Sequence, residues 1–153
     1  MMSFMVDSTL IVEHLKGNKS ARDLIEMLID SDANAYINSV VASEVLFIYI
    51  KLTTGRSYLT LKKNPQLVKA LDKRPVYNLL RMFKFVDTNE FIFSVAERLI
   101  DKYGLLPNDA LILATALFYG FDYLITFDSD FLEPCKAEGV KVISSKKELE
   151  KIL

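Results

Sequence analysis

The strongest constraint on the fold lies in residues 105–131, where an apolar helix, a tight turn, a short strand and an acidic loop follow one another. Residues 110–118 are apolar around most of the helix circumference, which indicates a helix covered on nearly every side. Gly120 is placed to end this helix in the left-handed conformation. Residues 123–126 are too short for a helix and predict a buried strand. This order is typical of an α/β sheet, whose ligands bind beyond the carboxyl ends of the strands.

Three acids flank that helix and strand. Pro107 fits the helix entry and Asn108 its N-cap, which places Asp109 in the first turn, where free N–H groups and the helix dipole favour a negative charge. A favourable helix start is therefore the simplest explanation of Asp109. Asp128 and Asp130 follow the strand, at the end where such a sheet binds its ligands.

The first half of the chain places two further acids in comparable positions. Residues 3–6 predict a strand that Asp7 ends, with Asp7 or Ser8 capping the next helix. Residues 35–38 predict the second strand, and Ser39 is expected to cap a helix over 40–51. Glu44 lies in that helix, and its neighbours three and four positions away are all apolar. A carboxylate in such surroundings needs a cation, hydrogen bonds or a proton.

Four of these acids are predicted to fall on one rim of the sheet: Asp7, Glu44, Asp109 and Asp128. Two carboxylates about 5 Å apart repel by roughly 3 kcal/mol at an effective dielectric near 20, so their convergence without a cation is costly. Ligands that offer only oxygen suit Mg²⁺ or Mn²⁺ far better than Zn²⁺. We therefore expect a divalent metal site.

The remaining pattern predicts a three-layer α/β/α fold around a mostly parallel, twisted sheet, with a helical insert. Helices are expected over 20–29, over 88–103 and after Ser145, and strands at 85–86 and 140–143, with no helix between residues 126 and 140. The second of these helices is expected to turn four residues inward: Phe91, Val95, Leu99 and Ile100. We predict one domain over 1–153 with the insert at 51–84.

Composition limits the possible locations and chemistry. Apolar runs reach only about ten residues, short of the roughly 20 needed to cross a bilayer, and no signal peptide is visible, so we expect a cytoplasmic protein. Cys135 is the only cysteine and His14 the only histidine, which excludes a disulfide and a cysteine zinc cage. We expect His14 on the surface and assign it no role. Any catalysis would depend on carboxylates.

Residues 51–84 differ from the rest in charge. They hold nine Lys and Arg residues and one acid, a formal charge of +8, so a whole-chain net charge of −1 leaves −9 for the remainder. An ordinary solvated helical face explains this segment, and so does a surface that follows phosphates. Under the second explanation four residues are candidates for nucleic-acid binding: Lys62, Lys63, Lys73 and Arg74.

Four short segments in this order resemble the PIN-domain family, in particular small prokaryotic ribonucleases of the VapC toxin type. They are residues 5–9 (Met-Val-Asp-Ser-Thr), 42–44 (Ala-Ser-Glu), 108–110 (Asn-Asp-Ala) and 126–131 (Thr-Phe-Asp-Ser-Asp-Phe). The basic insert is longer than the usual helix pair of these toxins.

The resemblance implies a metal-dependent endoribonuclease that leaves a 5′-phosphate and a 3′-hydroxyl. Its implied catalytic residues and metal ligands are Asp7, Glu44, Asp109 and Asp128. Asp130 joins the ligands, and Thr126 and Ser8 support the site. The implied cofactor is Mg²⁺ or Mn²⁺, and the implied partners are RNA, an antitoxin protein and a second copy of the chain, joined through apolar helix surface that includes Phe47 and Ile50.

Two other classes of protein would place acids on this rim. A receiver-like phospho-acceptor domain needs an acidic pair after the first strand and a lysine after the last, whereas here Ser8 follows Asp7 and Ser144 follows Ile143. A PIN scaffold that binds RNA or a protein without cutting is the closer alternative. The intact acidic quartet argues against it, because a scaffold has no need of a charged Glu44 in apolar surroundings.

Overall fold

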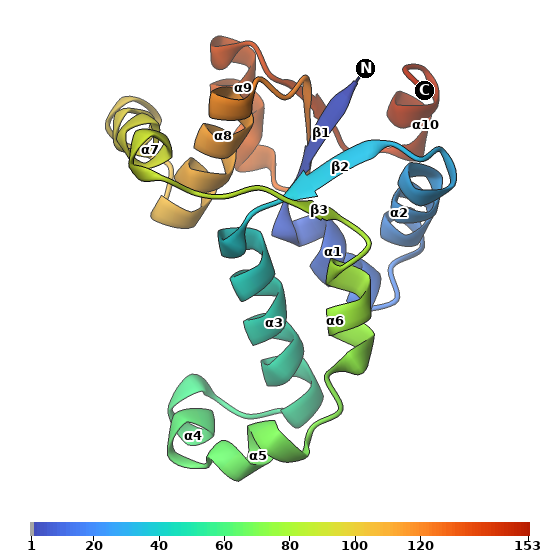
Figure 1. The fold of residues 1–153 in the computed structure, drawn as a ribbon, viewed down its shortest axis with the longest axis vertical. Helices are drawn as coiled ribbons and strands as arrows, with labels where there is room; N and C mark the ends of the chain where they lie inside the picture. The colour runs from blue at the N-terminus through green and yellow to red at the C-terminus, as the bar shows by residue number, and fades with distance from the viewer. Residues whose placement is uncertain (1) are drawn as a thin grey trace.

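A computed structural model describes residues 2–153 and contains a five-stranded sheet with the order β3-β2-β1-β4-β5 (Figure 1). The strands are β1 (Ser3–Val6), β2 (Asn34–Ile37), β3 (Lys84–Phe85), β4 (Tyr123–Ile125) and β5 (Lys141–Ile143). Every strand pairing is parallel. Because β1 is the central strand, the residue that follows it lies between the carboxyl ends of β2 and β4.

Helices cover both faces of the sheet, with α7 and α8 on one side and α2 and α10 on the other (Figure 1). The helices are α1 (Ser8–Leu15), α2 (Lys19–Asp30), α3 (Ser39–Thr54), α4 (Tyr58–Lys63), α5 (Pro65–Ala70), α6 (Arg74–Leu80), α7 (Glu90–Tyr103), α8 (Pro107–Tyr119), the 3₁₀ turn η1 (Ser129–Phe131), α9 (Leu132–Glu138) and α10 (Lys146–Glu150). The predicted three-layer α/β/α fold with a parallel sheet is confirmed. Among the described residues, no helix is both long enough and apolar enough to cross a membrane.

Helix α8 forms much of the core, as its composition predicts. Ile112, Leu113 and Ala116 are fully buried, and burying one Leu or Ile side chain contributes roughly 1.5–3 kcal/mol. The helix ends at Gly120, whose φ of 68° is the predicted left-handed conformation. These contacts fix the start of α8, which carries Asp109, beside the carboxyl ends of β1 and β4.

Two predicted helix caps are one or two residues too late. Asn108 is not the N-cap of α8, because Pro107 takes the first helical position and makes Leu106 the cap. Likewise Asn38, and not Ser39, caps α3. The Asn38 side chain accepts a hydrogen bond from the Val41 N–H at 3.0 Å and donates to Thr115 Oγ1 at 2.8 Å. The cap therefore also joins α3 to α8.

Three further predictions are wrong. Strands β4 and β5 are joined through η1 and α9, where no helix was expected. Parallel neighbours require a crossover connection, and this one is helical. Phe91 is 64% exposed, because Ile92, Ala96 and Leu99 form the stripe of α7 that faces the core. His14 is half-buried rather than solvated, and burial lowers its pKa.

We call residues 51–84 the basic arm. Helix α3 leads away from the sheet, α4 and α5 lie at its far end, and α6 leads back toward β3 (Figure 1). Gly55 ends α3 at a φ of 65°, and Pro65 occupies the first turn of α5, so the arm is divided into short helices.

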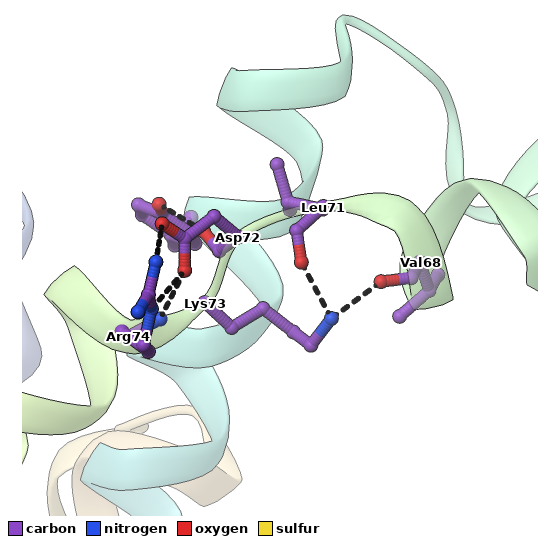
Figure 2. A network of polar contacts seen from close by, with 6 residues as sticks. Val68, Leu71, Asp72, Lys73 and Arg74 are labelled. Carbon is purple, nitrogen blue, oxygen red and sulfur yellow. Dashed lines mark hydrogen bonds and ion pairs between the residues drawn. The ribbon is translucent and has the colours of Figure 1, made fainter.

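Two of the arm's cations have partners within the arm itself (Figure 2). The Lys73 ammonium group donates to the carbonyl oxygens of Val68 at 2.6 Å and Leu71 at 2.7 Å, at the end of α5. The Arg74 guanidinium group donates to both carboxylate oxygens of Asp72, at 3.1 and 3.2 Å. These bonds hold the turn between α5 and α6.

Candidate metal centre

Asp7 is the most deeply buried acid of the predicted set, with 1% of its surface exposed. Its Oδ2 atom accepts hydrogen bonds from the hydroxyl groups of Thr9 and Thr126, both at 2.7 Å. Its Oδ1 atom is buried without a hydrogen-bond partner among the described residues. An unsatisfied buried polar atom costs about 1–3 kcal/mol, more when charged, so this oxygen suits a cation ligand.

Three aspartates approach one another beside it. One carboxylate oxygen each from Asp109, Asp128 and Asp130 lies within 4.8 Å of the other two. The loop after β4 is folded by its own hydrogen bonds: the Asp128 N–H donates to Thr126 Oγ1 and the Asp130 N–H donates to Asp128 Oδ1, both at 2.9 Å. The loop after β4 and the turn η1 therefore place Asp128 and Asp130 beside Asp109, in the first turn of α8.

Glu44 is half-buried and accepts hydrogen bonds, which is one of the ways in which a carboxylate among apolar neighbours can be stabilised. Ser8 Oγ donates to its Oε1 atom and Asn108 Nδ2 donates to its Oε2 atom, both at 3.1 Å. These donors come from the starts of α1 and α8, so Glu44 is held beside Asp7 and Asp109 in the chain's folded form. The expected supporting position of Ser8 corresponds to this contact.

The electrostatics of Asp109 show that the acids act on one another. Its pKa is raised to about 7, first by burial and then by the charges of the other four acids: Asp7, Asp128, Glu44 and Asp130. Burial also raises the pKa of Asp7, although hydrogen bonds from Thr9 and Thr126 oppose that shift. The structure thus brings all five predicted ligands into one acidic centre; their role as ligands stays a prediction.

Two residues of this centre were not predicted as site residues. Thr9 binds Asp7, and its hydroxyl oxygen also accepts a hydrogen bond from the Phe127 N–H at 3.0 Å, which links the start of α1 to the loop after β4. Asn108 binds Glu44 where a cap was expected. Asn108 is next to Asp109 and Thr9 lies two positions after Asp7, and both fall within the short segments that resemble the PIN-domain family.

The four candidate RNA-binding residues do not lie in the acidic centre. Lys62 and Lys63 are exposed on α4, whereas Lys73 and Arg74 have the partners described above. Glu44 and the end of α3 at Thr54 are separated by ten residues, about 15 Å of helix. The acidic centre and the basic arm are therefore distinct regions joined by α3.

The fold and the centre define the class of this chain as a parallel α/β/α domain whose central strands end in a cluster of carboxylates. More particularly, residues 4–137 match the PIN domain, and the chain belongs to that family. The resemblance of the four short segments to this family is thereby confirmed.

Individual relatives agree. The chain is 41% identical to Ribonuclease VapC2 of Methanocaldococcus jannaschii over 125 residues, which cover 82% of this chain and 84% of the relative. It is 36% identical to Ribonuclease VapC6 of the same organism over 138 residues, covering 82% and 88%. Among solved structures, a toxin-antitoxin complex from Klebsiella pneumoniae contains a chain with the same fold, at a TM-score of 0.64 and 21% identity, covering 93% of this chain and 97% of that one.

Proposed function

We propose that this protein is a metal-dependent endoribonuclease that hydrolyses RNA phosphodiester bonds. The observation that carries the proposal is the acidic centre, in which Asp109, Asp128 and Asp130 lie within 4.8 Å of one another, the charges of Asp7 and Glu44 also raise the pKa of Asp109, and a buried Asp7 oxygen has no partner among the described residues. The two curated relatives, both called ribonucleases, support it. Metal-dependent cleavage of RNA agrees both with the cluster of carboxylates and with the names of the relatives.

The residues fit Mg²⁺ or Mn²⁺, because every donor in the set is an oxygen. Asp7, Glu44, Asp109 and Asp128 would hold the ion, with Asp130 completing the set. When bound, such an ion lowers the pKa of a water molecule and neutralises charge that develops on a phosphodiester.

The chain's own contribution is orientation. Thr9 and Thr126 fix one oxygen of Asp7, so that the other is held in place before any ligand arrives. Ser8 and Asn108 do the same for Glu44. Donors that fix a ligand's direction in this way raise its affinity for a metal ion, typically by 10- to 100-fold.

The proposed biological role is the toxin of a toxin-antitoxin pair, with an antitoxin protein as its partner. The support is that the structural neighbour is a toxin-antitoxin complex and that both relatives are called VapC ribonucleases. Co-expression of the chain with the product of a neighbouring short reading frame should yield a complex that suppresses RNA cleavage. Free, fully active protein in the presence of that product would remove this role and leave the nuclease.

We also propose a single domain over residues 1–153 that functions as a homodimer. The surface expected at Phe47 and Ile50 stays a prediction. Exposed aromatic side chains of α7 and α8 offer a second apolar helix surface, with Phe91, Phe93 and Phe118 exposed by 64%, 58% and 44%. Light scattering at high concentration should give twice the mass of the 17.4 kDa chain. A monomer would end the proposal.

The alternative is a PIN scaffold that binds without cutting. A cleavage assay on a mixed RNA substrate, with Mg²⁺ and with a chelator, separates the two. We expect cleavage only with the metal ion, and none from Asp7→Asn. Cleavage that is equal in both proteins would assign it to a contaminant and leave the scaffold.

A further inference from the structure

One groove connects the acidic centre to helix α3. It has a volume of about 480 Å³ and is lined by Ser39, Val40, Ser43, Glu44, Phe47 and Asn108. Two of these residues, Glu44 and Asn108, belong to the acidic centre. Glu44, Phe47 and Lys51 follow at intervals of three and four, so they lie on one face of α3 within roughly 10 Å.

Beyond the groove, two aromatic rings and two cations form a cluster. The rings of Phe47 and Tyr58 meet edge to face, with centroids 5.8 Å apart. The Lys51 ammonium group lies 5.3 Å from the centroid of the Phe47 ring, and that of Lys62 lies 5.8 Å from the Tyr58 ring. This contact joins α3 to α4, and each ring of the pair has a lysine beside it.

The members of this cluster are available to a ligand. Phe47 is 39% exposed and Tyr58 54%, and both lysines are exposed. Within residues 2–153 neither ammonium group has a carboxylate within 4.0 Å, in contrast to Arg74. An exposed Tyr or Phe side chain is a large apolar surface in contact with water. Here a lysine ammonium group lies beside each of the two rings.

The surroundings of Asp109 and Asp130 have a different character. A second groove of about 420 Å³ is lined in part by Asp109, Asp130 and Glu133, and its charged side chains are all acidic. A polyanion is repelled there and attracted on the α3 side. The chain thus favours one direction of approach.

We propose that Phe47, Tyr58, Lys51 and Lys62 form a binding track for single-stranded RNA on the Glu44 side of the acidic centre. Bases stack on the rings while phosphates contact the ammonium groups, the combination by which proteins bind single strands without reading sequence. The choice of RNA rests on the proposed function. A protein partner would cover the rings but has no need of a cation beside each one.

The test measures binding without cleavage. Fluorescence anisotropy with a labelled 12-nucleotide oligouridine, in a chelator, gives the affinity at several salt concentrations. Tyr58→Ala should weaken binding by about 5- to 150-fold, the range for loss of one stacked base. Tyr58→Phe keeps the ring and should bind like the wild type. Tyr77→Ala removes another exposed aromatic side chain of the arm and should also bind like the wild type.

The cations are tested through salt. Each phosphate contact contributes a slope of roughly −0.7 to the dependence of log affinity on log salt for a single strand, so Lys51→Ala with Lys62→Ala should flatten the slope by about 1.4. Circular dichroism confirms that each variant is folded.

The outcomes separate this inference from the nuclease proposal. Ring-dependent RNA binding in a protein that cuts no RNA would sustain the track and remove the nuclease. Cleavage of RNA by a protein whose Tyr58→Ala variant binds normally would overturn the track and leave the nuclease. A Tyr58→Ala variant with altered oligomeric mass and unaltered RNA affinity would also overturn it, by assigning the rings to a contact between proteins.

Discussion

The acidic centre and the basic arm are both concentrations of one charge, but they are built differently. In the centre, threonine, serine and asparagine side chains hold carboxylates that repel one another, and one carboxylate is almost fully buried. In the arm, most cations are exposed: Lys73 and Arg74 are bound to neighbouring groups of the same short segment, Lys84 donates to Asn34, and Lys51 and Lys62 lie against aromatic rings. Carboxylates held together against their mutual repulsion indicate a site for a cation. Exposed lysine and arginine side chains are compatible with many roles or none.

The largest test of this difference is the removal of one charge from the centre. Asp7→Asn or Asp109→Asn should reduce RNA cleavage by more than about 100-fold, beyond the loss typical of residues that only orient a ligand. The metal-free melting temperature should stay the same or rise, because repulsion is relieved. Asp101→Asn, an exposed acid of α7, is the matched control. Near-normal cleavage in both variants would remove these residues from the site.

The second test adds a divalent metal ion to the acidic centre. At 100 times its dissociation constant, Mg²⁺ or Mn²⁺ should stabilise the folded protein by about 2.7 kcal/mol, which is roughly 5–10 °C in melting temperature for a chain of this size. Glu44→Gln should show a much smaller shift, and Glu97→Gln, an exposed change on α7, a normal one. Equal shifts in Glu44→Gln and the wild type would mean that Glu44 is not a ligand.

The third test uses pH. The folded pKa of Asp109, about 7, lies above its usual value of 3.8, so the folded state binds more protons than the unfolded state between these values. The metal-free protein should therefore lose stability as pH rises from 5 to 7 and level off above that. A decline of a few degrees in melting temperature is expected, since Asp109 is only half-buried. Asp109→Asn should flatten it, and so should saturating Mg²⁺, which favours the deprotonated ligands. A wild-type profile that rises across this window would contradict the assigned shift.

The smallest test divides the arm. Lys62→Ala with Lys63→Ala should flatten the salt dependence of RNA binding by up to about 1.4 units of slope, because both ammonium groups are free to reach phosphate. Lys73→Ala with Arg74→Ala should change that slope less and instead lower the melting temperature by a few degrees, because the bonds at the end of α5 are lost. Identical slopes in wild type and in both double variants would make the arm a solvated face or a surface for a protein partner.

Most of the fold was predictable because apolar periodicity marks the buried elements directly. The central strands, α8 and its end at Gly120 all follow from local sequence. Helix α9 was missed because Leu132 to Glu138 is short and mixed in polarity, so that only the crossover rule for parallel strands points to it. Phe91 was misplaced because α7 has aromatic residues outside its buried stripe, and hydrophobicity alone does not choose between the two.

The acids of the site were predictable from their places after strands and at helix starts, whereas their hydrogen-bond donors were not. Thr9 reaches Asp7 and Phe127 at once, and the sequence separation between Thr9 and Phe127 is 118 positions. Asn108 binds Glu44 across 64 positions. Such contacts depend on tertiary structure and leave no periodic pattern in a single sequence.

The pairing of β1 with β4 determines at which stage of its synthesis the chain can form the acidic centre. Asp7 and Thr126 are 119 positions apart and meet only after β4 has been inserted beside β1. Contacts this distant in sequence form late and slowly, since a long loop must close before they are made. A ribosome that has completed three quarters of the chain has therefore made Asp7, Glu44 and Asp109 without a centre that can hold an ion. We expect nascent and truncated chains to be harmless to the RNA around them, and the acidic centre to appear only as one of the last events of folding.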